Sequence, residues 1–134
     1  MRYCLALYLL MASWLEPPVL QLEIAGIKAI QGNIMVAVYD SGENFLSQKV
    51  ITSGIFEVTG STVQGILRLP YGTYGISVFH DQDSNGELNT NLFGIPKEPV
   101  GFSNNARGTF GPPDFEQTTF DFLEDRQTIK IKID

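Results

Sequence analysis

Residues 118–133 read TTFDFLEDRQTIKIKI, and apolar and polar side chains alternate through most of this stretch. Apolar or β-branched residues occupy every second position, at Thr118, Phe120 and Phe122 and again at Ile129, Ile131 and Ile133. Successive side chains of a β-strand point to opposite faces, so a period of two buries one face and exposes the other. We therefore predict two short strands here, each packed by one face against a core.

The same period of two recurs upstream. It predicts the buried faces of four further strands, at Leu20, Leu22 and Ile24; Ile34, Val36 and Val38; Val63, Leu67 and Leu69; and Tyr74, Ile76 and Val78. The strand at 33–39 is apolar at both parities, which predicts a central strand covered on both faces. The less regular stretch 45–59 has room for one or two more strands. About seven short strands without an amphipathic helix predict an all-β fold, a Greek-key β-sandwich.

The length and charge of the chain limit its domain organisation and the partners it can bind. The chain has 134 residues, of which 43% are apolar, and 15 acidic against 9 basic side chains give a net charge of -6. This length predicts one domain, and the apolar fraction excludes a disordered chain. Nucleic-acid binding draws its affinity from clustered lysine and arginine, which are scattered here. We therefore exclude nucleic acid as a partner.

The N-terminus is a separate segment. Residues 3–15 are apolar except for Ser13 and follow one cation, Arg2. The run is too short to span a membrane and matches the apolar region of a signal peptide. We predict a signal peptide over 1–15, a single domain over 16–134 without a membrane span, and a periplasmic or secreted location. An uncleaved anchor and an apolar helix packed on the domain are the alternatives. The single cysteine, Cys4, would leave with the signal, which removes disulfide scaffolds, zinc knuckles and thiol catalysis.

The segment 81–115 lacks alternation and is rich in Gly, Pro and Asn. Loops longer than about 12–15 residues are uncommon in compact domains unless they are functional or disordered. Disorder is disfavoured because the segment carries eight large apolar residues, namely Leu88, Leu92, Phe93, Ile95, Val100, Phe102, Phe110 and Phe115. We therefore predict one long, ordered, functional loop over 81–115.

The loop opens with DQDSNGELN at 81–89, in which oxygen-bearing residues recur around a central glycine, Gly86. Calcium takes six to eight oxygen ligands, and alternate residues curling around an ion supply them while the glycine makes the sharp turn. The predicted ligands are the side chains of Asp81, Asp83 and Asn85, the main-chain carbonyl of Glu87, and Asn89 directly or through water. Leu88 would point inward as an apolar plug.

One carboxylate of the helix-loop-helix calcium pattern is missing, because Leu92 stands at the twelfth position. Glu98 or Asp40 could complete the shell, and spacing alone does not choose between them. With so few carboxylates we expect a Ca²⁺ affinity on the order of 10⁻⁴ to 10⁻⁵ M. A turn network without an ion and a site for another metal are the alternatives.

Two sets of residues carry a family resemblance. LPYGTY at 69–74 resembles the turn and strand of transthyretin-like and carboxypeptidase-regulatory-like sandwiches. VFHDQDSNGELNTN at 78–91, with FGIPKE at 93–98, GFSNN at 101–105 and FGPP at 110–113, resembles the bacterial domain-of-unknown-function family 2141. The resemblance implies an exported sandwich of transthyretin (prealbumin) type with no assigned activity and no catalytic residues; an immunoglobulin-like sandwich is the alternative for the fold. Asn89 stands where that family has Asp, which would weaken the ion site by one charge.

Catalysis finds little support in the sequence. His80 is the only histidine, and Ser77 lacks the second glycine of a nucleophile elbow. We interpret His80 as structural and assign Glu87 and Glu98 to the ion rather than to a glycosidase pair. We interpret most of the loop aromatics as the loop's own small core, although exposed rings could stack on sugars or dock a protein.

The preferred interpretation is a non-enzymatic binding or structural module of the envelope, whose partner is an envelope protein or carbohydrate. A small envelope hydrolase that uses His80 or loop carboxylates is the alternative, and ligand transport is a third.

Overall fold

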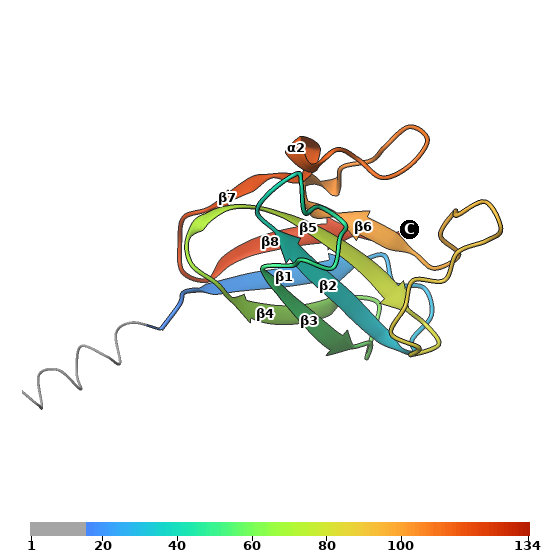
Figure 1. The fold of residues 1–134 in the computed structure, drawn as a ribbon. Coiled ribbons are helices and arrows are strands. Elements are labelled where there is room, and N and C mark those ends of the chain that lie inside the picture. Colours follow the sequence, from blue (N-terminus) through green and yellow to red (C-terminus); the bar gives the residue numbers. More distant parts are fainter. Residues whose placement is uncertain (1–15) are drawn as a thin grey trace, which may run out of the picture.

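Two β-sheets pack against each other in the computed structural model, which describes residues 16–134 (Figure 1). One sheet has the order β4-β1-β8, formed by Val63–Arg68, Val19–Ala25 and Gln127–Lys132. The other has the order β3-β2-β5-β6, formed by Thr52–Glu57, Asn33–Tyr39, Gly72–Asp81 and Val100–Phe102, and β7 (Phe120–Phe122) pairs with the first residues of β5. The predicted all-β sandwich is confirmed, with eight strands among the described residues.

The residues that alternation predicts as buried form the core. Side chains from both sheets form one buried cluster, and it contains every apolar residue assigned above to a buried face of the four upstream strands. Phe122, Ile131 and Ile133 are also buried, whereas Phe120 and Ile129 pack against the cluster while partly exposed. Strand β2 lies between β3 and β5 as predicted, but the prediction that it is covered on both faces is only partly correct. On its outer face Tyr39 is buried and Met35 and Ala37 are half-buried.

Two local predictions are wrong. The strand predicted from Thr118 begins at Phe120, because Thr118 ends a one-turn helix, α2 (Phe115–Thr118). Asp114 and Gln117 form a reciprocal capping box at its start, which satisfies amide groups that a helix end leaves free. The segment 81–115 is also not one continuous loop, since β6 and a short 3₁₀ turn at Ser103–Asn105 lie within it. Strand β6 has three residues in a segment rich in Gly, Pro and Asn, so no sustained alternation marks it.

Strand pairing places the C-terminal strand β8 beside the N-terminal strand β1. Strand β1 pairs antiparallel with β4 and parallel with β8, so the last strand lies beside the first. Strand β5 extends beyond Val78, the last residue assigned above to its buried face, and carries His80 and Asp81 as its last residues. The predicted signal peptide at 1–15 lies outside the described residues. Within 16–134, the structure contains no helix of the length and apolarity that a membrane crossing requires.

Candidate functional site

Asp81 ends strand β5 and starts the segment 81–98, the ion loop, which begins with the predicted calcium motif. Its side chain is buried, and its main chain pairs with Asn33 at the start of β2. One carboxylate oxygen accepts the main-chain N–H of Gly86 at 2.8 Å and the other accepts that of Asn85 at 3.2 Å. Gly86 has φ 78°, a conformation that glycine adopts without steric cost. The chain therefore turns back around the Asp81 carboxylate, as the motif predicts.

Glu98 returns from the far end of the loop to the same place. The main chain next to Glu98 is fixed to β5, because the main-chain N–H of His80 donates to the main-chain carbonyl of Pro99 at 2.9 Å. This hydrogen bond lies next to the pairing of β5 with β6. The buried Glu98 carboxylate accepts the main-chain N–H of Gln82 at 2.6 Å and that of Asn89 at 3.0 Å. Its two oxygens thus hold both ends of the loop.

The structure brings three carboxylates together. One oxygen each from Asp81, Asp83 and Glu98 lies within 4.8 Å of the other two, with Asp83 exposed and its partners buried. The Asn89 side-chain amide donates to Asp83 at 2.8 Å and, as the largest contribution, lowers the pKa of Asp83. Asn85 donates in turn to the Asn89 amide oxygen at 2.8 Å. The amide side chains predicted as ligands therefore lie beside the carboxylates, where they form hydrogen bonds.

The remaining predicted residues are placed differently. Of the two candidates for completing the shell, Glu98 joins the cluster and Asp40 does not. Asp40 follows the opposite end of β2, seven residues from Asn33 or about 23 Å at strand rise. The Glu87 side chain is exposed and outside the cluster, so only its main-chain carbonyl remains a predicted ligand. Leu88 is half-buried and lines a pocket.

The donor set fits a hard cation. All the clustered groups offer oxygen, and none offers the nitrogen or sulfur that zinc prefers. Three ionised carboxylates so close together repel one another, and main-chain and side-chain amides offset part of that repulsion. The same hydrogen bonds are what a turn network without an ion would contain. The three carboxylates could hold a hard metal ion.

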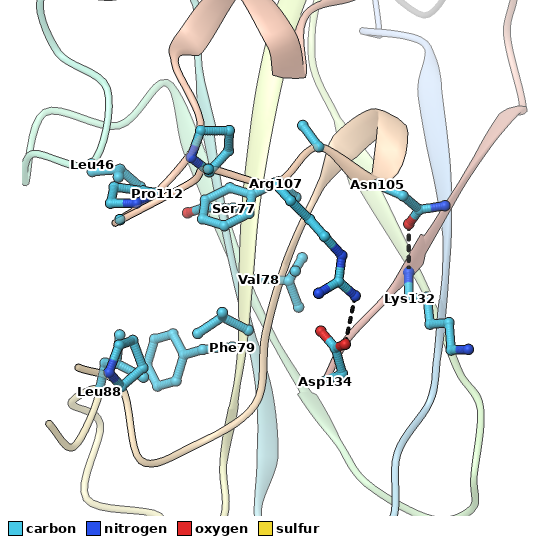
Figure 2. Close-up of a pocket in the computed structure, with 18 of the residues that line it drawn as sticks. Leu46, Ser77, Val78, Phe79, Leu88, Asn105, Arg107, Pro112, Lys132 and Asp134 are labelled. Carbon is cyan, nitrogen blue, oxygen red and sulfur yellow. Dashed lines mark hydrogen bonds and ion pairs between the residues drawn. The ribbon is translucent and has the colours of Figure 1, made fainter. Parts of the chain in front are cut away.

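A pocket of about 740 Å³ lies beside this cluster, between the ion loop and the segment 106–113. Figure 2 shows Ser77 and Phe79 of β5, Leu88 of the ion loop, and Leu46 and Pro112 among its walls. Figure 1 shows the ion loop and the segment 106–113 projecting on the side where β6 lies. Sequence reasoning missed this pocket, because its walls come from segments far apart in the chain.

The predicted small core of loop aromatics is only partly correct. Phe102 and Phe115 are half-buried and pack on Phe45, with ring centroids 6.2 and 5.6 Å from its own. Phe93 and Phe110, by contrast, are 87% and 103% exposed. Leu92 and Ile95 of the ion loop are exposed as well, whereas the exposed Tyr71 precedes the opposite end of β5 and packs on Phe122. The ion loop and the segment 106–113 thus carry apolar side chains that the sandwich does not cover.

His80 lies apart from the carboxylates. Its imidazole is completely buried and its Nε2 is 2.6 Å from the Gln31 carbonyl oxygen, so Nε2 carries the proton. Its Nδ1 has no hydrogen-bond partner among residues 16–134. Ser77 is an odd number of residues away on β5, so the two side chains point to opposite faces. Glu98 uses both carboxylate oxygens on main-chain N–H groups.

Comparisons with known proteins give one match. A family model, DUF2141, described as an uncharacterized protein conserved in bacteria, matches residues 22–130. The search of curated proteins and the search of solved structures each returned no significant match. The match covers both sheets, the carboxylate cluster and most of the pocket walls.

Proposed function

The chain belongs to the DUF2141 family, whose description assigns no activity, and we propose from its geometry that it is a non-enzymatic, calcium-binding module of the bacterial envelope. The observation that carries the proposal is the meeting of the Asp81, Asp83 and Glu98 carboxylates within 4.8 Å. Two of them come from the start of the loop and one from its end. A bound ion would therefore tie the two ends together.

Calcium suits the cluster better than other cations. Ca²⁺ accepts irregular sets of six to eight oxygens at about 2.3–2.6 Å, whereas Mg²⁺ demands near-octahedral geometry at about 2.0–2.1 Å. The carboxylates and the Glu87 carbonyl would supply such a set with water and with the Asn85 and Asn89 amide oxygens, which accept hydrogen bonds within the loop in this structure. The expected affinity, on the order of 10⁻⁴ to 10⁻⁵ M, suits calcium concentrations outside the cytoplasm.

Export is part of the same proposal. A signal peptide over 1–15 would deliver the domain to the periplasm or the medium. Mass spectrometry of the protein recovered from the periplasmic or extracellular fraction should give a mass that lacks this segment. Full-length protein found only in the cytoplasmic fraction would contradict export while leaving the ion site standing.

A non-enzymatic role is supported by how the candidate catalytic groups are used. The His80 imidazole is completely buried, and the Glu98 carboxylate is buried, accepts two main-chain N–H groups and is assigned to the ion. Panels of glycoside and ester substrates should show no turnover. Turnover that is lost in both His80→Ala and Glu98→Gln would establish the hydrolase instead.

Calorimetric titration of the full chain with Ca²⁺ tests the ion site. Wild-type protein should bind one ion, and Mg²⁺ should bind more weakly. Asp83→Asn removes one of three charges at an exposed position and should weaken Ca²⁺ binding about tenfold or more, which corresponds to about 1.4 kcal/mol.

Glu87→Gln is the matched control, since it removes an exposed carboxylate of the same loop but keeps the predicted main-chain ligand. Its affinity should stay within about twofold of wild type. Equal loss in both variants would show that only the general negative charge of the loop attracts the ion. No saturable Ca²⁺ binding to the wild-type protein would overturn the proposed function.

A further inference from the structure

The pocket beside the ion loop has the properties of a binding site for a small apolar molecule. Its volume of about 740 Å³ is within the usual range for small-molecule sites, about 300–1,000 Å³. Its lining is mostly apolar, with contributions from Leu46, Phe79, Leu88, Val100, Phe102 and Pro112. Exposed apolar side chains on the ion loop and at Phe110 add surface from which a ligand would exclude water.

One side of the pocket is polar and includes two cationic residues, Arg107 and Lys132. Arg107 lines the pocket, and its guanidinium contacts the Asp134 carboxylate through one terminal nitrogen at 2.5 Å. Figure 2 shows the second terminal nitrogen directed toward the part of the pocket that Val78 lines. A guanidinium has five N–H donors in a planar fork, and Asp134 is the only partner that the structure gives it within 16–134. The free edge of Arg107 therefore matches a carboxylate.

Leu46 is a second, independent indication that this pocket is used. It lines the pocket, is 43% exposed, and has φ 61°, in the left-handed region. A leucine there costs roughly 1–2 kcal/mol, a cost that glycine does not bear and asparagine bears less. Asn or Gly at this position would make the folded state more stable. An apolar side chain held there against that cost is explained by contact with a ligand.

We propose that the pocket between the ion loop and the segment 106–113 binds an amphipathic carboxylic acid. The apolar body of the ligand lies against Leu46, Phe79 and Leu88, and its carboxylate binds the free edge of Arg107. Asp134 competes for the same guanidinium when no ligand is bound. This inference goes beyond the calcium site and is tested both with Ca²⁺ and with chelator.

The experiment titrates the full chain with decanoate and, separately, with decanol, which has the same chain length and a neutral head group. Saturable binding of one decanoate per chain, at least about tenfold tighter than decanol, is expected. Arg107→Gln should remove that preference and leave decanol binding unchanged. Lys130→Gln is the matched control, because it removes one positive charge from a residue of β8 that does not line this pocket, and it should change neither affinity.

Two further variants separate binding from folding. Leu46→Asn should weaken both ligands about fivefold while its thermal midpoint equals or exceeds that of wild type, because asparagine suits the left-handed backbone. Asp134→Asn removes the competing charge and should tighten decanoate about threefold without affecting decanol.

Failure of decanoate to bind, or equal binding of decanoate and decanol, would overturn the proposal. Binding to phosphatidylglycerol vesicles without binding of free decanoate would also overturn it and assign the exposed apolar side chains to membrane docking. Because the calcium titration is a separate measurement, failure here leaves the proposed function intact, and failure there leaves this pocket intact.

Discussion

The imidazole of His80 joins strand β5 to the loop that precedes β2. Its Nε2–H donates to the Gln31 carbonyl oxygen, and the ring has no exposed surface. A lone histidine next to an aspartate suggests a catalytic pair in a sequence, but adjacent residues of a strand face opposite sides. The burial of His80 follows from its parity with Tyr74, Ile76 and Val78, which alternation does predict.

Replacement of His80 by leucine should destabilise the domain by about 1–3 kcal/mol, because it leaves the Gln31 carbonyl without its buried donor. Urea unfolding measures this change. Gln31→Ala is the control, since it removes the side chain and keeps the main-chain carbonyl, and it should cost less than about 0.5 kcal/mol. Equal losses in the two variants would contradict a role based on that hydrogen bond.

The residues proposed to bind the ion differ in how well the sequence predicts their positions. The closeness of Asp81, Asp83, Asn85 and Asn89 follows from spacing, because they lie within nine residues, over which the chain has few ways to turn; their role as ligands stays a prediction. Glu98 could not be separated from Asp40 by spacing, since only the register of β2 with β5 shows that Asp40 is distant. The strain at Leu46 has no sequence signature, because a leucine in an irregular segment gives no sign of its φ.

Among the elements, helix α2 is held on β5 by very close packing. Gly75 faces Thr118 and Phe115, and a Cβ at this position would overlap the Thr118 hydroxyl. Alternation alone predicted a strand from Thr118, whereas the D-x-x-Q spacing of Asp114 and Gln117 is a capping signal that indicates the helix start. Alternation therefore predicted the long strands and the three-residue β7, but it did not predict β6, and α2 was indicated only by its capping residues.

Gly75→Ala should displace α2 and destabilise the domain by about 1–3 kcal/mol, the usual cost of overpacking. Thermal unfolding checks the loss. Gly111→Ala adds the same methyl group where no atom lies within 4 Å, so its midpoint should match wild type. If Gly75→Ala is also neutral, α2 is not held by this contact.

For the whole molecule, the carboxylate cluster and the pocket share the ion loop. Leu88 lies in that loop and also lines the pocket. An ion that holds the loop in place would also hold one wall of the pocket, so the two proposed ligands should assist each other. Thermodynamic linkage requires this effect to be reciprocal, with the same factor in both directions.

Decanoate affinity should therefore rise about threefold or more on going from chelator to saturating Ca²⁺, and Ca²⁺ affinity should rise by the same factor with saturating decanoate. Paired calorimetric titrations measure both factors. Binding of both ligands without mutual influence would show that the loop has one conformation regardless of the ion.

The proposed function requires a calcium ion that ties the ends of the ion loop through Asp81, Asp83 and Glu98. This requirement is checked by thermal unfolding of the full chain in millimolar Ca²⁺ and in excess chelator. Calcium at about one hundred times its dissociation constant adds about 2.7 kcal/mol, which should raise the midpoint by about 10 °C. Glu87→Gln should keep this increase and Asp83→Asn should lose most of it. Identical midpoints for the wild-type protein in Ca²⁺ and in chelator would contradict the claim.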